Sequence, residues 1–146
     1  MATFSRSATT DWAGSIMEGK GQVKGATGAF TLPVTFPSRV GEPSGQTSPE
    51  ELMAASHAAC YAMALNATLG RKGGSAARTV VTATVSADKS EAGIKLTSSK
   101  LKVVASGLKG VEKGAFAEVA REAEGKCPIS NALRGALQIE LETEVK

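Results

Sequence analysis

Two cysteines and one histidine are the residues of this chain best suited to chemistry. His57 and Cys60 lie in the stretch SPEELMAASHAACYAMAL, and Cys127 lies in GKCPISNALRG. A cysteine thiolate is a nucleophile, and a nearby histidine can activate it as a general base. The three residues are therefore compatible with a thiol hydrolase or acyl carrier, with a two-cysteine redox site, or with buried thiols that do no chemistry.

The stretch around Cys60 is predicted to be a helix. Ser48 is a good N-cap, Pro49 suits the first helical position, and Glu51 completes a capping-box pattern. Residues 52–69 are mostly Ala, Leu, Met and Cys, so the helix should be buried nearly all round. Gly70 should end it.

The position of Cys60 in this helix decides what could activate its thiol. Cys60 would lie about 16 Å from the helix N-terminus, beyond the first turn in which the helix dipole acts. A thiolate at Cys60 therefore needs a basic group from elsewhere. His57 shares its helix face, but adjacent turns of one helix rarely orient a Cys–His pair for proton transfer. A structural role for His57 is favoured.

Cys127 falls where one predicted helix has ended and Pro128 begins another, so it occupies or neighbours an N-cap. Backbone N–H groups there favour a thiolate, which makes Cys127 the lower-pKa thiol unless an unseen cation serves Cys60. The alternative is a small capping residue. A zinc site built from His57 and the two cysteines is disfavoured, because CPISN offers no second ligand on a short knuckle.

Composition narrows the class of protein. A chain of 146 residues fits one domain, residues 1–146, and can bury about two thirds of its extended surface. Its 17 basic residues are dispersed among 14 acidic ones, which disfavours nucleic-acid binding. The N-terminal stretch lacks an apolar signal-peptide core, and no window approaches a membrane span. We expect a cytoplasmic protein, where a cysteine pair that does bond is usually catalytic or redox-sensing.

The remaining periodicities predict strands before and after central helices. Residues 30–36 alternate as a strand, which Pro33 makes an edge strand or an irregular one. A loop is expected over residues 40–47. An apolar phase shift between Leu96 and Leu101 indicates a bulge in a later strand.

Together these elements predict an α+β fold with a mostly antiparallel sheet and two central helices. Strands are predicted near residues 78–88, 93–106 and 137–145, and helices near residues 111–125 and from Pro128. A core of Ala, Val and Leu from so short a chain is thin, which favours further burial against a second copy.

The motifs around the two cysteines resemble those of a known family. SPEELMAASHAACYAMAL and KCPISNALRG, with cysteines 67 residues apart, look like the two cysteine motifs of the OsmC/Ohr family, the osmotically inducible and organic-hydroperoxide-resistance peroxidases. The opening DWAGSIMEGKGQV and the final acidic strand also sit where that family has theirs, so the resemblance covers essentially the whole chain. The ASHAAC form and the DWAG opening resemble the OsmC branch more than the Ohr branch.

The resemblance implies a thiol peroxidase that reduces organic hydroperoxides, and hydrogen peroxide less well. Cys60 would be the peroxidatic thiolate and form a sulfenic acid, and Cys127 would resolve it as a Cys60–Cys127 disulfide. An external dithiol, of lipoyl type in some family members, would reopen that bond, with no bound cofactor or metal. Arg39 would be the catalytic arginine and Glu50 its carboxylate partner. The family fold is an intertwined α+β homodimer whose active sites use both subunits.

Physical chemistry adds to this implication. The Arg39 guanidinium near Cys60 would lower the thiol pKa and stabilise the leaving oxygen, while Glu50 could hold Arg39 by a bidentate ion pair. Glu50 and Cys60 share the predicted helix about 15 Å apart. Because a Glu side chain cannot span that distance, we expect Glu50 to serve Cys60 of the partner subunit.

Two further expectations concern substrate and alternatives. Phe36, Leu52 and Met53 would form an apolar approach that suits fatty or aromatic hydroperoxides. The competing hypotheses are a Cys–His thiol hydrolase and a non-enzymatic protein that senses redox state or binds a ligand.

Overall fold

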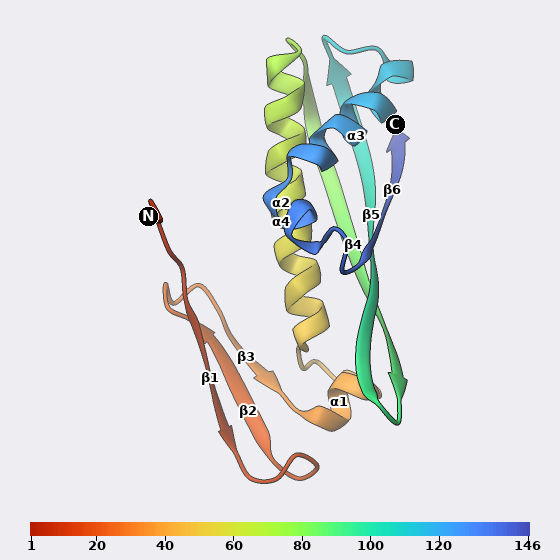
Figure 1. Ribbon diagram of the computed structural model, residues 1–146. Coiled ribbons are helices and arrows are strands. Elements are labelled where there is room, and N and C mark those ends of the chain that lie inside the picture. Colours follow the sequence, from red (N-terminus) through yellow and green to blue (C-terminus); the bar gives the residue numbers. More distant parts are fainter. The chain divides into compact units, whose positions relative to one another are not determined.

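The computed structural model describes all 146 residues and divides into two compact units, residues 1–52 and residues 53–146 (Figure 1). Each unit has its own three-stranded sheet. The assignment of residues 1–146 to one domain stays a prediction. None of the helices combines the length and the apolar character needed to cross a membrane.

The first unit is built on an antiparallel sheet of β1 (Ala8–Ala13), β2 (Lys20–Gly25) and β3 (Thr31–Val34), in that order. Pro33 lies in β3, which is an edge strand as predicted, because proline has no N–H to donate to a second neighbour. β3 is short and ends before Phe36.

The segment after β3 corrects the sequence prediction. Alternation predicted a strand up to Phe36, but Phe36–Val40 form the short helix α1. Thr35 caps it, with its Oγ1 accepting a hydrogen bond from the Ser38 N–H at 3.3 Å, and Pro37 suits the first turn. Local capping overrides the alternation and places Arg39 in the last turn of α1.

Helix α2 (Pro49–Arg71) begins where the capping pattern predicted and ends one residue past Gly70. The Ser48 Oγ accepts a hydrogen bond from the Glu51 N–H at 3.1 Å, which is one half of the predicted capping box. The Glu51 carboxylate instead accepts a hydrogen bond from the Thr47 hydroxyl at 2.9 Å.

The second unit holds the sheet β4 (Ser75–Ser90), β5 (Gly93–Lys109) and β6 (Gln138–Val145), in that order. β4 and β5 pair antiparallel, whereas β5 and β6 pair parallel. The predicted α+β class with mostly antiparallel pairing is confirmed. The parallel pair arises because η1 (Lys113–Ala115), α3 (Phe116–Lys126) and α4 (Pro128–Leu133) carry the chain back between these strands.

The predicted bulge lies at Thr97 of β5, between Leu96 and Leu101. The β4–β5 register shifts there, so that Thr97 is paired with no residue of β4 in the ladder, although its hydroxyl donates a hydrogen bond to the Ser86 carbonyl at 3.2 Å. After the bulge every second residue of β5 is fully buried, beginning with Ser99. The buried row continues through Leu101, Val103 and Ala105. The bulge therefore decides that Ser99 lies on the inner face of the sheet.

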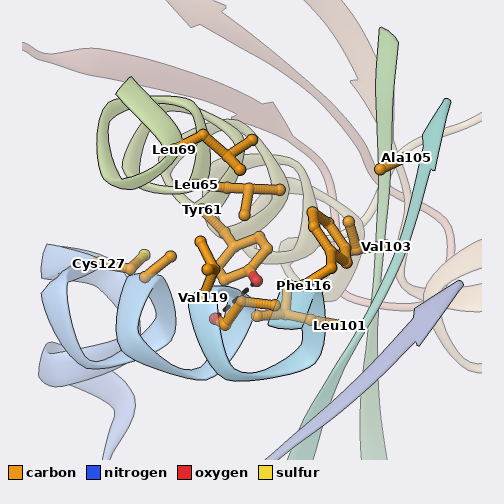
Figure 2. Close-up of a cluster of buried hydrophobic side chains, with 11 residues drawn as sticks. Tyr61, Leu65, Leu69, Leu101, Val103, Ala105, Phe116, Val119 and Cys127 are labelled. Atoms are coloured by element: carbon orange, nitrogen blue, oxygen red, sulfur yellow. Dashed lines mark hydrogen bonds between the residues drawn. The ribbon is translucent and has the colours of Figure 1, made fainter. Parts of the chain in front are cut away.

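The core of the second unit lies between α2, α3 and the inner face of β5 (Figure 2). Tyr61, Leu65 and Leu69 of α2 pack against Phe116 of α3, and all four are at most 1% exposed. The hydroxyl of Tyr61 donates a hydrogen bond to the Ala120 carbonyl at 2.9 Å, the dashed line in Figure 2. This packing fixes the rotation of α2 about its own axis.

One face of α2 remains exposed, which corrects the expectation of burial nearly all round. Ala55, Ala59 and Met63 follow one another at one-turn spacing on exposed positions, and Met63 is 73% exposed. The helix is apolar on both faces, but this chain provides only enough partner surface for one of them.

Candidate functional site

The two thiols meet in the second unit. Cys60 lies on α2 and is partly buried, whereas Cys127 is fully buried where α3 ends and α4 begins. Both are free thiols, Cys60 packs against the buried cluster to which Cys127 belongs, and Cys127 lies close enough to raise the pKa of Cys60. Two thiols brought together in this way are candidates for a disulfide bond.

The first turn of α4 provides a hydrogen-bond donor to each sulfur. Cys127 is the N-cap of α4, as predicted, and its Sγ accepts a hydrogen bond from the Ser130 N–H at 3.4 Å. The backbone N–H of Ile129 lies near the Cys60 thiol and lowers its pKa. This second donor could not be predicted from the sequence, because it belongs to a segment far from Cys60 in the chain and not to the N-terminus of the helix that carries Cys60.

The electrostatics of the thiol pair do not favour a thiolate at Cys60. Burial raises the pKa of Cys60, the Ile129 N–H lowers it, and the contact with Cys127 raises it again, so that the pKa stands above its ordinary value. A thiol in this state is protonated at neutral pH. Nucleophilic chemistry at Cys60 therefore requires a cation close to it, as the sequence analysis anticipated.

His57 is fully buried and is bonded to two serines rather than to a cysteine. Its Nδ1 lies 2.7 Å from the Ser99 Oγ, and its Nε2 lies 2.7 Å from the Ser130 Oγ. Burial lowers the pKa of His57, although the Glu124 carboxylate partly opposes this shift. The predicted structural role is confirmed, since both ring nitrogens are occupied. Ser99 and Ser130 were missed by sequence analysis, although Ser130 belongs to the CPISN motif.

No group of three or more His, Cys, Asp or Glu side chains gathers where it could hold a metal ion. The serine hydroxyls on both nitrogens of His57 also leave no lone pair on that ring for a metal.

In the first unit, Arg39 and Glu50 form the ion pair that the sequence analysis predicted. The Arg39 Nε lies 3.1 and 3.2 Å from the two Glu50 carboxylate oxygens, and its Nη2 lies 2.7 Å from Oε1. The Arg39 and Glu50 side chains are 29% and 16% exposed, so the pair is partly shielded from water. This forked contact fixes the plane of the guanidinium. The catalytic roles of the two residues stay predictions.

The charge state of Glu50 follows from this pairing. Partial burial raises the pKa of Glu50, but hydrogen bonds from Arg39 and from its own backbone N–H, with the charge of Arg39, lower it by more. The resulting pKa is below the ordinary value of 4.5. Glu50 therefore remains a carboxylate, and Arg39 remains clamped, throughout the neutral range.

A mostly apolar cavity of about 380 Å³ opens beside Arg39 within the first unit. Phe36 and Leu52 line it, as expected, but Met53 is not among its lining residues. Its other lining residues are Thr10, Trp12, Ile16, Val23, Val34, Thr35, Arg39 and Pro49. The cavity has space for an organic group next to a fixed cation.

The fold and these features define a small α+β protein with a two-cysteine thiol site and a clamped arginine. Residues 41–142 match the family described as OsmC-like protein, and the chain belongs to this family. The peroxiredoxin OsmC of Escherichia coli is 34% identical over 139 residues, which cover 94% of this chain and 96% of that protein.

Solved structures agree with this family assignment. The organic hydroperoxide resistance protein OsmC of Legionella pneumophila is 27% identical, covers 99% of both chains and has a TM-score of 0.75. The organic hydroperoxide resistance protein OhrB of Bacillus subtilis is 26% identical, covers 98% of this chain and all of its own, and has a TM-score of 0.76. The resemblance inferred from the cysteine motifs is confirmed.

The ion pair between Arg39 and Glu50 predicts a measurable change in the Glu50 pKa when Arg39 is replaced. Replacing Arg39 by Met should raise the Glu50 pKa above its wild-type value, because burial then acts without the opposing cation. Arg39→Lys should give an intermediate pKa, because it keeps the charge but loses the fork. Carboxyl ¹³C NMR titration measures these values.

The same shift sets a pH window for stability. The contribution of the pair to the free energy of unfolding should be complete above the ordinary carboxyl pKa and lost as pH falls through the lower folded pKa. An unchanged Glu50 pKa in Arg39→Met would contradict the assignment of Arg39 as the group that holds this carboxylate ionised.

Proposed function

We propose that this protein is a thiol-dependent peroxidase that reduces organic hydroperoxides to alcohols, and hydrogen peroxide less well. The observation that carries the proposal is that Cys60 lies beside Cys127 at the first turn of α4 and packs against the same buried cluster. The names of its relatives, a peroxiredoxin and two organic hydroperoxide resistance proteins, support the same activity.

The reaction proceeds in three balanced steps. The Cys60 thiolate attacks one oxygen of the hydroperoxide, so that an S–O bond forms, the O–O bond breaks, and the alkoxide leaves as alcohol after taking up a proton. The Cys127 thiolate then attacks the Cys60 sulfenic sulfur. An S–S bond forms, the S–O bond breaks, and the hydroxide leaves as water. An external dithiol, for which we propose a lipoyl-type compound, exchanges with the disulfide and becomes oxidised in turn.

Arg39 supplies the cation that Cys60 requires. A guanidinium near the sulfur lowers the thiol pKa against the effect of burial, and it stabilises negative charge on the departing oxygen. Glu50 holds the guanidinium in one plane through the forked ion pair. The apolar cavity beside Arg39 favours substrates with an organic group over hydrogen peroxide.

The active protein is a homodimer in which each site draws on both subunits. Glu50 and Cys60 are ten residues apart on the continuous helix α2, about 15 Å along its axis, so the Arg39–Glu50 pair serves Cys60 of the partner subunit. The exposed apolar face of α2, with Ala55, Ala59 and Met63, supports this assembly. Small side chains at one-turn spacing allow two such helices to approach closely.

Two alternatives are weaker. A thiol hydrolase would need His57 as the base for Cys60, but both nitrogens of His57 are bonded to serines. A non-enzymatic redox sensor would share the disulfide chemistry but not rapid repeated turnover. We place the protein in the cytoplasm, where the reduced thiol pair that starts the cycle is maintained.

The roles of the two cysteines are separable by mutation. Cys60→Ser should consume no hydroperoxide, because it lacks the nucleophile. Cys127→Ser should react once with hydroperoxide but fail to turn over with dihydrolipoamide, because no disulfide forms. Hydroperoxide consumption is measured with dihydrolipoamide, thioredoxin or glutathione on each variant. Full turnover by Cys127→Ser with dihydrolipoamide would contradict the resolving role.

Substrate preference tests the cavity. For the wild type, kcat/KM for cumene hydroperoxide should exceed that for hydrogen peroxide by at least about tenfold, or ~1.4 kcal/mol of transition-state stabilisation. Ile16→Ala should lower kcat/KM for cumene hydroperoxide several-fold, because it removes a side chain that lines the cavity. It should leave kcat/KM for hydrogen peroxide unchanged. Phe4→Ala is the matched control, because Phe4 is exposed and does not line the cavity. A wild-type preference for hydrogen peroxide would refute the substrate assignment.

Subunit mixing tests the contribution of Glu50 in trans. Cys60→Ser and Glu50→Gln homodimers should both be impaired. A heterodimer of the two variants has one site that combines the intact Cys60 of one subunit with the intact Glu50 of the other, so mixing by unfolding and refolding should restore activity. If Glu50 acts on its own chain, no site in the heterodimer holds both residues. The mixture would then stay at the average of the two homodimers.

A further inference from the structure

His57 links three elements of the second unit through one buried side chain. It lies on α2, one turn before Cys60, and its two nitrogens are each 2.7 Å from a serine hydroxyl, Ser99 on β5 and Ser130 on α4. All three polar side chains are fully buried. This connection is not part of the peroxidase chemistry described above.

Ser130 joins this connection to the resolving thiol. Its Oγ is bonded to His57, while its backbone N–H donates a hydrogen bond to the Cys127 Sγ at 3.4 Å. Ser130 therefore couples the position of the His57 ring to the first turn of α4, on which the direction of the Cys127 side chain depends. At the other end of the ring, the bulge at Thr97 turns Ser99 inward to meet the Nδ1 atom.

The energy of these bonds is sufficient to fix α4. A buried hydroxyl or ring nitrogen left without its hydrogen-bond partner is strongly unfavourable, and displacement of α4 from His57 would leave two such groups unpaired. α4 has only six residues, so its own helical hydrogen bonds hold it weakly. The low pKa of His57 keeps the ring neutral, with one donor and one acceptor nitrogen to match the two hydroxyls.

We propose that His57 is a positioning residue for disulfide formation: through Ser130 it holds the first turn of α4 so that the Cys127 sulfur faces Cys60. The inference rests on the proposed peroxidase function and concerns its second step. In that step the Cys127 thiolate displaces hydroxide from the Cys60 sulfenic acid, an S–S bond forms and an S–O bond breaks.

The competing fate of the sulfenic acid provides the measurement. A second hydroperoxide molecule can transfer oxygen to the Cys60 sulfenic acid, which gives a sulfinic acid and another alcohol. The ratio of sulfinic acid to disulfide therefore compares the rate of the resolving step with that of further oxidation, whatever the rate at which the sulfenic acid first formed. This separation is needed because Ile129, which bonds Cys60, also belongs to the first turn of α4.

The decisive variants remove one bond at a time. Ser130→Ala deletes the hydroxyl but keeps the backbone N–H that donates a hydrogen bond to the Cys127 Sγ. His57→Asn keeps a polar group near the Nδ1 position, which faces Ser99, whereas His57→Gln can place one near the Nε2 position, which faces Ser130. Tyr61→Phe is the matched control, because it removes a buried hydrogen bond from the same face of α2, but one that leads to α3.

Each variant is treated with a fixed excess of cumene hydroperoxide and dihydrolipoamide, and sulfinic Cys60 per turnover is counted by intact-mass spectrometry. Ser130→Ala and His57→Asn should raise this ratio about tenfold or more, because small misplacements of a reacting group cost up to about 100-fold in rate. For His57→Gln and Tyr61→Phe, the amount of sulfinic Cys60 per turnover should stay near the wild-type value. Urea unfolding of each variant checks that the compared proteins are folded.

The outcomes separate this inference from the proposed function. A wild-type ratio in Ser130→Ala, or an equal rise in Tyr61→Phe, would overturn the positioning role, since the first removes the coupling and the second only weakens the core. Wild-type protein that forms no Cys60–Cys127 disulfide with hydroperoxide would overturn the proposed mechanism itself.

Discussion

The packing of one face of α2 against β5 and α3 is the constraint on which the thiol site depends. His57, Tyr61, Leu65 and Leu69 recur at one-turn spacing and are all essentially buried. Two of the four also carry hydrogen bonds, from Tyr61 to α3 and from His57 to α4 and β5. An apolar stripe alone would tolerate small rotations of the helix, but these bonds do not. Cys60, one residue before Tyr61, is therefore held at a fixed position against Cys127.

This arrangement makes a buried thiol that is well placed but poorly ionised. The burial that positions Cys60 also raises its pKa, and the single N–H from Ile129 does not compensate. The Arg39–Glu50 pair is assembled independently in the first unit by the cap of α1 and the start of α2. In the proposed mechanism the reactivity of Cys60 depends on bringing these two parts together across a dimer, so an isolated chain would hold an inert thiol.

Much of the local structure was predictable because its causes are local. The Ser48 cap and Pro49 marked the start of α2, and the phase shift after Leu96 marked the bulge at Thr97. The strand predicted up to Phe36 was wrong, because the Thr35 cap and Pro37 start α1 there. The expected burial of α2 on all sides was also wrong, since apolar composition does not say how much partner surface one chain supplies. Met63, an apolar side chain that is 73% exposed, is the clearest example of an α2 residue without a partner surface in this chain.

From the residues alone one could identify the side chains that can do chemistry, the helix that carries Cys60, the N-cap position of Cys127 and, by spacing along one helix, the separation of Glu50 from Cys60. The family resemblance also paired Arg39 with Glu50, and the structure shows their side chains in contact. The packing of separate elements brings the two thiols together, places the Ile129 N–H near Cys60, and bonds His57 to Ser99 and Ser130 rather than to a cysteine. The physical reason is that caps and helical spacing act within a few residues of chain. Contacts between side chains on α2, β5 and α4 depend instead on how separate elements pack, and no local pattern encodes that packing.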